Sequence, residues 1–301
     1  MKNKKIVVIG SANTDMVVKT DELPTHGETK LGEYFIMNSG GKGANQAVTV
    51  ARLGGDLIFI TKVGNDIFGE YTITGLRKEK IDTDFVLIDK NTPSGVALIM
   101  VDKEGENYIV VAPGANSKLS PNDVYQVKDT IAEAEIILIQ LEIPIVTISA
   151  IIEIAKTTGQ KVILNPAPAQ RLDFDLLDGL FLITPNETEA SLLTGIPVKE
   201  ELTARKAAQI IHDKGVQNVI ITLGAQGAYL HNGTTSRIIH GKKVKAIDTT
   251  AAGDVFNGAM AVAISEGMNL EDAAGFANSA AAIAVTRLGA QSSVPFRNEI
   301  L

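Results

Sequence analysis

Short apolar runs recur along the whole chain, and polar or glycine-containing segments separate them. The runs are continuous and rich in β-branched residues, a pattern typical of strands that are buried on both faces of a sheet. The predicted strands are Ile6–Ile9, Leu57–Ile60, Ile136–Ile139, Val162–Leu164, Leu180–Ile183 and Val219–Leu223.

Segments of helical length lie between these runs. Strands that alternate with helices predict a mostly parallel sheet covered on both faces, which is a three-layer α/β/α sandwich. The predicted helices are Ala44–Leu53, Phe68–Glu79, Pro121–Ala132, Pro144–Lys156, Thr203–Lys214, Val255–Glu266 and Leu270–Leu288.

Two regions, Met16–Met37 and Gly95–Val111, break this alternation because they have the pattern of strands with no helix between them. Within the second, Val96–Val101 and Tyr108–Ala112 flank a polar, glycine-containing turn, which predicts a β-hairpin. We expect a small β-sheet attached to the main body as a lid, although an edge extension of the large sheet would fit the same pattern. The predicted main body comprises residues 1–15, 38–94 and 112–301, and the predicted small sheet comprises residues 16–37 and 95–111.

Composition narrows the classes of function. The chain has 301 residues, and its 28 Lys and Arg against 35 Asp and Glu give a formal net charge of −7. Such an acidic chain is a poor general binder of nucleic acid or anionic membranes, so any anion must be held by local geometry. The absence of cysteine excludes disulfides and thiolate metal sites. No run approaches the roughly 18 apolar residues of a membrane span, and we expect a cytoplasmic protein.

A glycine-rich cluster, Ser39–Asn45, precedes the first predicted helix. Its glycines let the backbone approach a ligand closely, and the start of the helix offers free N–H groups. Gly43 follows Lys42 where a Walker A loop requires Ser or Thr, and no Gly-x-Gly-x-x-Gly dinucleotide motif occurs. A tight strand–helix turn without a ligand would also use these glycines.

A second cluster, Asp248–Asp254, opens the predicted helix Val255–Glu266. Thr and Asp are common helix caps, which is the structural interpretation. Because Ala251–Gly253 are small, their N–H groups could also converge on a phosphoryl group at the positive end of the helix dipole. Asp254 lies beside that anion hole and can accept a proton from a hydroxyl, and we expect the dipole to keep it ionised.

Shorter polar clusters follow other predicted strands. Thr222–Gly227 turns from one strand into the next, and Asn186–Glu189 has the spacing of a helix capping box. Asn13–Asp15 and Glu142 can hydrogen-bond a polyhydroxylated substrate, a type of site that rejects analogues lacking a hydroxyl. Taken singly, each is better explained as a turn, a cap or a solvated residue. The four histidines show no metal-binding spacing.

Taken together, three of these segments share the order and spacing of one enzyme family: Gly40–Asn45, Asn186–Glu189 and Asp248–Asp254. They resemble the motifs of the PfkB carbohydrate kinases, and within that family most closely those of the ribokinases. The resemblance covers nearly the whole chain. The Thr-Ala-Ala-Gly-Asp form of the last segment is typical of ribokinases, whereas many relatives carry Gly at the position of Ala251.

The resemblance implies ATP-dependent phosphorylation of D-ribose at its 5-hydroxyl. Asp254 would be the catalytic base, and Ala251, Ala252 and Gly253 would line the anion hole. The residues that would hold the sugar are Asn13, Asp15, Gly41, Lys42, Asn45 and Glu142. The residues that would lie along the nucleotide are Asn186, Thr222, Gly224, Gly227, Gly253 and Asn278.

The resemblance also implies cations and a partner. Mg²⁺ would accompany ATP, with Glu189 organising the metal and phosphate region, and an activating K⁺ would bind beside the active site. The positions that match the K⁺ site are Asp248, Thr250, Ala284, Arg287, Gly289 and Ser293. A homodimer would form through the small sheet. Ribokinases usually continue a little beyond the position of Leu301, a difference that touches none of the motif residues.

Two other functions stay open. A kinase for another acceptor, such as deoxyribose, fructose or adenosine, would share the motifs, although the few aromatic residues near Asn13 and Glu142 disfavour a stacked nucleobase. A non-catalytic sugar or nucleotide sensor could use the same fold. Such a sensor should have lost a catalytic group, and Lys42, Gly253 and Asp254 are all present.

Overall fold

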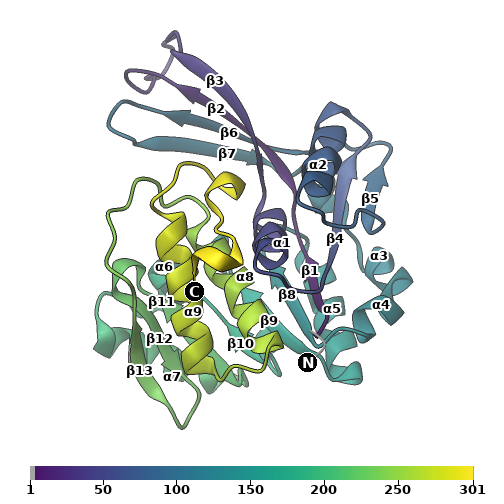
Figure 1. The fold of residues 1–301 in the computed structure, drawn as a ribbon, viewed down its shortest axis with the longest axis vertical. Helices are drawn as coiled ribbons and strands as arrows, with labels where there is room; N and C mark the ends of the chain where they lie inside the picture. The colour runs from purple at the N-terminus through teal and green to yellow at the C-terminus, as the bar shows by residue number, and fades with distance from the viewer. Residues whose placement is uncertain (1–3, 301) are drawn as a thin grey trace.

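The computed structural model describes residues 4–300, which form two β-sheets with helices packed around the larger one (Figure 1). Neighbouring strands of the larger sheet are parallel, except that the last two strands of the chain join it antiparallel. In spatial order its strands are β13 (Ser236–His240), β12 (Gly227–His231), β11 (Asn218–Thr222), β10 (Leu182–Ile183), β9 (Lys161–Asn165), β8 (Ile136–Gln140), β1 (Ile6–Ile9), β4 (Leu57–Gly64) and β5 (Val86–Asp89).

Helices cover both faces of the larger sheet, because successive residues of a strand point to opposite faces and here both sets are apolar. In β1, Ile6 and Val8 pack on one side and Val7 and Ile9 on the other. The first side carries α1 (Lys42–Arg52), α2 (Ile67–Lys78), α8 (Ala252–Ser265) and α9 (Leu270–Ala284). The second side carries α3 (Pro121–Gln126), α4 (Lys128–Ala132), α5 (Ile145–Thr158), α6 (Glu187–Thr194) and α7 (Glu201–His212). Within residues 4–300, no helix is both long and apolar enough to cross a membrane.

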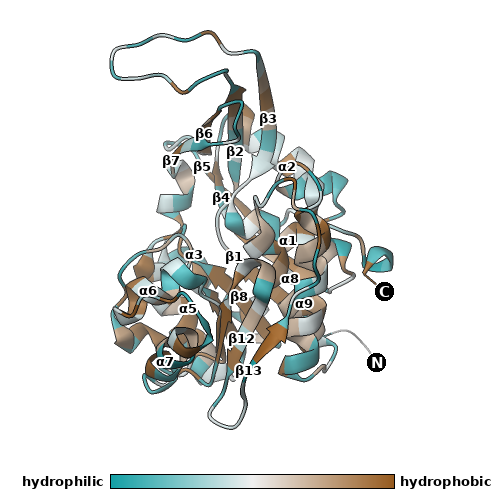
Figure 2. Ribbon diagram, turned by 90° about the vertical axis from the view of Figure 1, so that its left-hand side faces the viewer, coloured by the Kyte–Doolittle hydropathy of each residue, from teal (hydrophilic) through white to brown (hydrophobic). Residues whose placement is uncertain are grey.

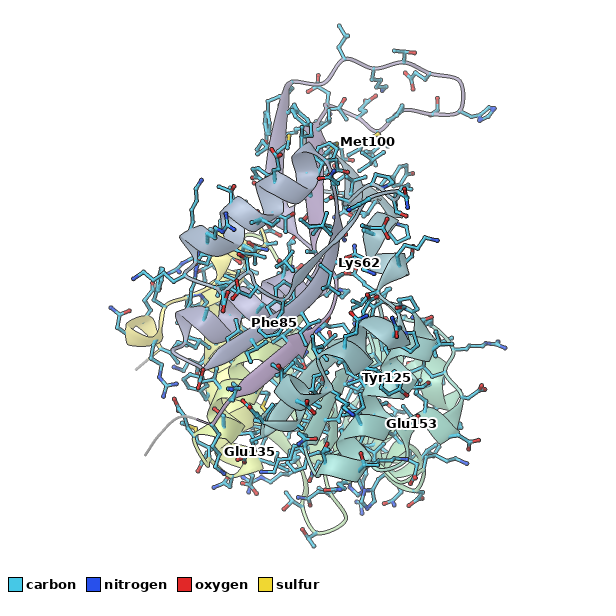
Figure 3. All side chains as sticks on the ribbon, turned by 90° about the vertical axis from the view of Figure 1, so that its right-hand side faces the viewer. Lys62, Phe85, Met100, Tyr125, Glu135 and Glu153 are labelled. Carbon is cyan, nitrogen blue, oxygen red and sulfur yellow. The ribbon has the colours of Figure 1, made fainter. Side chains whose placement is uncertain are left out.

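The small sheet stands over one end of the larger sheet (Figure 1). In spatial order its strands are β3 (Tyr34–Gly40), β2 (Asn13–Lys19), β6 (Gly95–Val101) and β7 (Asn107–Ala112). A short connection leads from β1 into β2, and β3 leads almost directly into α1, so the small sheet is joined to the body where body strands and helices meet. Met100 of β6 lies in the small sheet, well apart from Phe85 and Tyr125 on the body (Figure 3).

The predicted fold class is confirmed, because a mostly parallel sheet lies between two helical layers and carries a separate small sheet. The predicted hairpin is the pair β6 and β7. The edge-extension alternative is wrong, because in the described part of the chain the strands of the small sheet pair only with one another. The division into two domains at the predicted boundaries stays a prediction.

Most predicted helices differ from the structure by one to three residues at their ends, and two differ more. The helix predicted at Pro121–Ala132 is divided into α3 and α4, because Val127 leaves the helical conformation with φ −112° and ψ 19°. The helix predicted at Leu270–Leu288 ends before Val285, whose carbonyl accepts hydrogen bonds from the backbone of residues 247–248. The five 3₁₀ helices of the described chain are Gly114–Lys118, Phe174–Leu177, Gly224–Gln226, Gln291–Ser293 and Arg297–Glu299.

Candidate active site

The site is built around Asp254, a buried carboxylate in the first turn of α8. Asn45 Nδ2 donates a hydrogen bond to its Oδ2 at 2.9 Å, and Gln46 Nε2 donates to its Oδ1 at 3.0 Å. Burial raises the pKa of the Asp254 carboxyl, although the charge of Lys42 and the two amide donors act to lower it. The sequence led us to expect that the helix dipole keeps this group ionised, and burial acts in the opposite direction.

Glycines allow α1 to pack closely against the chain after β1 and against α8. Gly41 precedes α1 with φ +87°, which favours glycine, and a Cβ at Gly43 would lie 2.6 Å from the carbonyl carbon of Gly10. A Cβ at Gly258, one turn beyond Asp254 in α8, would lie 2.6 Å from Cβ of Thr49 in α1. The predicted glycine-rich loop is thus required by backbone packing, whatever ligand it contacts.

A cavity of about 200 Å³ lies at the start of α8. Ala251 precedes the helix in the left-handed conformation, with φ 60° and ψ 7°, and the amide of Ala252 donates to the carbonyl of Thr249 at 3.2 Å. The predicted anion-hole residues therefore lie together in one turn, although the amide of Ala252 is engaged within that turn. The cavity is lined by Lys42, Asn165, Ala167, Thr184, Asn186, Glu189, Thr222, Thr249, Ala251, Ala252, Gly253, Asp254 and Asn257.

Three acidic side chains approach one another beside this cavity. Asn13 and Asp15, which follow the first strand in the sequence, lie at the start of β2. The pKa of Asp15 rises to about 7 because of burial and of the nearby charges of Glu142 and Asp254. Glu142 Oε2 accepts a hydrogen bond from the backbone N–H of Lys42 at 3.0 Å. The structure therefore brings the predicted sugar-binding residues together with the predicted base.

Asn116, which the sequence pattern did not identify, holds Asn13 in place. The backbone N–H of Ala12 donates to Asn116 Oδ1 at 2.9 Å, which fixes the orientation of that amide. Asn116 Nδ2 then donates to Asn13 Oδ1 at 2.7 Å. The Nδ2 group of Asn13 is therefore the group left to meet a ligand. The pattern also did not identify Gln46, which has no local motif.

The Asn186–Glu189 motif is the capping box of α6. The backbone N–H of Glu189 donates to Asn186 Oδ1 at 2.8 Å, and the Glu189 carboxylate accepts from the backbone N–H of Asn186 at 2.9 Å. Burial raises the pKa of Glu189, against the lowering effects of Asn186 and Lys42. The structural interpretation of this motif is confirmed, and the same two side chains also line the cavity.

The predicted nucleotide-binding residues beyond the cavity meet at the end of β13. Gly227 has φ +103°, and a Cβ there would lie 2.2 Å from the carbonyl oxygen of Ile239. Asn278 Nδ2 of α9 donates to the same carbonyl at 2.9 Å. Gly224 opens the 3₁₀ turn with φ +52°, and its Cβ position is open. Turn geometry thus accounts for the glycines of this segment.

Three of the predicted cation residues meet around Asp248. Its Oδ1 accepts from the backbone N–H of Thr250 at 2.9 Å and its Oδ2 from that of Gly289 at 2.8 Å. Burial alone would raise the pKa of Asp248, but these hydrogen bonds lower it. The Arg287 side chain points elsewhere and pairs with Glu299. The other two predicted positions are in flanking segments: Ala284 at the end of α9 and Ser293 in a 3₁₀ helix.

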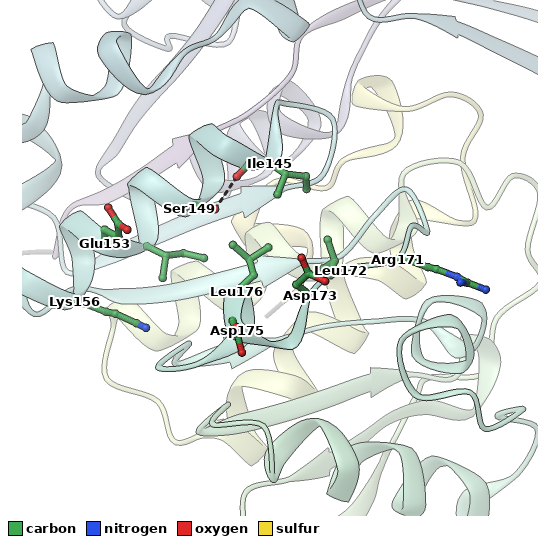
Figure 4. A pocket seen from close by; sticks show the side chains of 10 residues that line it. Ile145, Ser149, Glu153, Lys156, Arg171, Leu172, Asp173, Asp175 and Leu176 are labelled. Atoms are coloured by element: carbon green, nitrogen blue, oxygen red, sulfur yellow. Dashed lines mark hydrogen bonds between the residues drawn. The ribbon is translucent and has the colours of Figure 1, made fainter.

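Another cavity, of about 600 Å³, lies between α5 and the segment 171–176 (Figure 4). Acidic and basic side chains both line it, including Glu153, Lys156 and Asp173. Since none of the predicted site residues lines it, the cavity beside Asp254 is the candidate active site.

The Asp254 carboxylate lies at the start of a helix on a parallel α/β sheet, a position that suits a phosphotransferase. Comparison with known proteins shows which class of phosphotransferase this is. The pattern of the pfkB family carbohydrate kinases matches residues 3–297, so the chain belongs to that family. Over 298 residues it is 47% identical to the ribokinase of Haemophilus influenzae, covering 99% of this chain and 97% of that protein. The ribokinase structure from Thermotoga maritima has a TM-score of 0.91 and 44% identity, covering 99% of this chain and 98% of that one. The Arabidopsis thaliana ribokinase complexed with ribose and ATP has a TM-score of 0.91 and 33% identity, covering 100% and 98%.

Proposed function

We propose that this protein transfers the γ-phosphoryl group of ATP to the 5-hydroxyl of D-ribose, giving ribose 5-phosphate and ADP. One observation carries the proposal: Asp254 is a buried carboxylate that faces a polar cavity at the head of α8, with Asn45 and Lys42 beside it. Family membership and ribokinase relatives of similar length support the choice of reaction.

Asp254 accepts the proton of the 5-hydroxyl as the hydroxyl oxygen attacks the γ-phosphorus and the bond to the ADP oxygen breaks. Phosphoryl transfer needs positioning more than a strong base, so a buried carboxylate suffices. The backbone amides at Ala251–Gly253 stabilise negative charge on the migrating group, with the help of the helix dipole, once the amide of Ala252 turns from the carbonyl of Thr249 to the phosphoryl oxygen. Lys42 offsets the charge of Asp254 and of the phosphates.

The sugar contacts come from both sheets. Asn13 and Asp15 belong to the small sheet, whereas Gly41, Lys42, Asn45 and Glu142 belong to the body. Carboxylates and amides suit a ligand with several hydroxyl groups, and a site of this kind rejects analogues that lack one. The residues proposed along the nucleotide are Asn186, Thr222, Gly224, Gly227, Gly253 and Asn278.

Mg²⁺ would accompany the nucleotide and would supply positive charge to neutralise its phosphates. Glu189 faces the cavity as a partly desolvated carboxylate and would orient the waters of that ion.

The resemblance to ribokinases places a monovalent cation beside Asp248, whose carboxylate accepts hydrogen bonds from the backbone N–H groups of Thr250 and Gly289. We expect activity to rise with K⁺ at fixed ionic strength, and much less with Na⁺. Equal rates in the two salts would remove the cation proposal and leave the kinase proposal intact.

The test is coupled ADP release with ribose, deoxyribose, fructose and adenosine as acceptors. We expect the highest kcat/KM for ribose, and Asp254→Asn should lower kcat by about 10²–10⁴. A low rank for ribose would favour a kinase for another sugar. Calorimetric binding of ribose and ATP without ADP release would favour a sensor, and near-normal turnover in Asp254→Asn would refute the role of Asp254.

A further inference from the structure

Gln46 lies one layer behind the cavity. Its side chain is fully buried on α1, and it is not among the residues that line the cavity. Its Nε2 donates to Asp254 Oδ1 at 3.0 Å and to Asn165 Oδ1 at 3.1 Å. Gln46 therefore contacts the proposed base without reaching the space in which a substrate binds.

The direction of this amide is fixed by its partners. A carboxylate oxygen can only accept, so Gln46 must present its nitrogen to Asp254. Gln46 Oε1 then accepts from Gln140 Nε2 at 2.7 Å. Gln140 Oε1 is left buried without a partner in the described chain. An unpaired buried acceptor is unfavourable, so Gln140 Oε1 is a cost of this arrangement. In return, Gln140 fixes Gln46 with its nitrogen toward Asp254.

The two oxygens of Asp254 are therefore held differently. Asn45 donates to Oδ2, but Asn45 Oδ1 is buried without a partner in the described chain and can accept from a hydroxyl. Asn45 can thus transfer its interactions to a sugar, whereas Gln46 has its donors and acceptor already in use.

We propose that Gln46 is a positioning residue that holds Oδ1 of Asp254, so that Oδ2 is the oxygen that takes the proton from the acceptor hydroxyl. The inference rests on the proposed function. Once the sugar displaces Asn45 from Oδ2, Gln46 is the amide that still stabilises the ionised carboxylate. Without it, the carboxylate can rotate and loses a donor to its charged form, which raises the pKa of Asp254 further.

The first experiment compares Gln46→Met with wild type across pH. We expect kcat to fall about 10- to 100-fold, as for a misplaced reacting group, with the ribose KM within about threefold. The acidic limb of the kcat–pH profile should move to higher pH. The control is Ser265→Ala, which removes a buried hydrogen bond at the other end of α8 and should leave the profile unchanged. A folded Gln46→Met enzyme with the wild-type profile would overturn the proposal.

The second experiment uses the isosteric Gln46→Glu, which keeps the proposal testable if Gln46→Met does not fold. The introduced carboxyl can donate to Asp254 when it is protonated and repels Asp254 when it is ionised, so activity relative to wild type should fall as pH rises. Parallel profiles would contradict the proposal.

A third measurement needs no turnover: titration of the ¹³C-labelled Asp254 carboxyl by NMR, with the signal assigned by means of Asp254→Asn. A raised midpoint in Gln46→Met would support the role of the Gln46–Asp254 hydrogen bond, even if ribose proved not to be the acceptor. An unchanged midpoint would overturn the proposal.

Discussion

Acidic side chains outnumber basic side chains around the cavity, and the pKa values of individual residues reflect this excess. Lys42 has a raised pKa, chiefly because of Asp254 and then of Glu142 and Glu189, although burial acts against it. One ammonium group thus faces several carboxylates. Groups with such shifted pKa values are typical of functional sites, because a bound substrate or cation can relieve the repulsion between the carboxylates.

The excess of carboxylates around the cavity can be measured at Asp15, through its effect on the free energy of unfolding. Its pKa is about 7 in the folded chain against an ordinary value of 3.8, so the folded state binds its proton more tightly than the unfolded state. Stability is therefore lost as pH rises from about 4 through 7. We expect Asp15→Asn to raise the free energy of unfolding at pH 8 by up to about 4 kcal/mol and to have little effect at pH 4.

Denaturant unfolding of the ligand-free protein at the two pH values measures this difference. The control is Asp89→Asn: backbone hydrogen bonds from Asn91 and Thr92 lower the pKa of Asp89, so its loss should destabilise the protein at pH 8. An Asp15→Asn substitution that changes the free energy of unfolding equally at both pH values would contradict the raised pKa of Asp15.

Residues of the site could be predicted where a local motif carried them. Asp254 and Asn45 belong to short patterns in the sequence, and the structure joins them by a hydrogen bond. Gln46 and Asn116 could not be found in this way. Asn116 reaches Asn13 across 103 positions and Gln46 reaches Asp254 across 208, and both are ordinary polar residues in their own segments. Only the packed chain gives them a partner.

At the scale of elements, the approach of α1 to α8 sets the geometry of the base. Gly258→Ala would place its Cβ 2.6 Å from Cβ of Thr49, so the helices must separate. Overpacking of this kind lowers stability by about 1–3 kcal/mol. It should also lower kcat, because Asp254 moves away from Asn45 and Gln46.

Gly275 in α9 provides the matched control for this substitution. It also lies inside a helix, but a Cβ there meets nothing within 4 Å. Gly275→Ala should therefore raise stability, by up to about 1 kcal/mol, because alanine is the better helix former. Thermal unfolding and steady-state rates measure both variants. Equal effects of the two substitutions would show that helix contact at Gly258 is not what matters.

Among the strands of the larger sheet, those that the sequence predicted have a mostly buried pattern. The run Ile6–Ile9 matches β1 at both ends, because its residues are apolar on both faces of the sheet. The pattern did not predict β5 and β13, which are the two edge strands of the larger sheet and have partly exposed residues. It also did not predict α6, a helix of only 8 residues, although its capping box was visible.

At the scale of the whole molecule, the small sheet leaves apolar side chains uncovered. All of β7 is exposed, and so are the outer residues of β3, and Figure 2 shows brown, hydrophobic positions on these strands. Contiguous apolar surface of this kind usually marks an interaction site. The resemblance to ribokinases predicted a homodimer through this sheet, and a second copy of the same surface would cover it symmetrically.

The register of the small sheet supplies a direct test of that dimer. Leu98 of β6 lies opposite Val110 of β7, and their side chains are 52% and 65% exposed in the single chain. The double substitution Leu98→Asp with Val110→Asp would bury four like charges in a symmetric dimer, so we expect it to sediment as a monomer where wild type sediments as a dimer. The control, Val146→Asp with Leu202→Asp, adds two charges at exposed apolar positions of α5 and α7 and should leave the dimer intact. Because Asn13 and Asp15, the sugar contacts that we propose in the small sheet, belong to β2, loss of the dimer should raise the ribose KM more than it lowers kcat. A wild-type monomer, or a double variant that remains dimeric, would contradict the prediction.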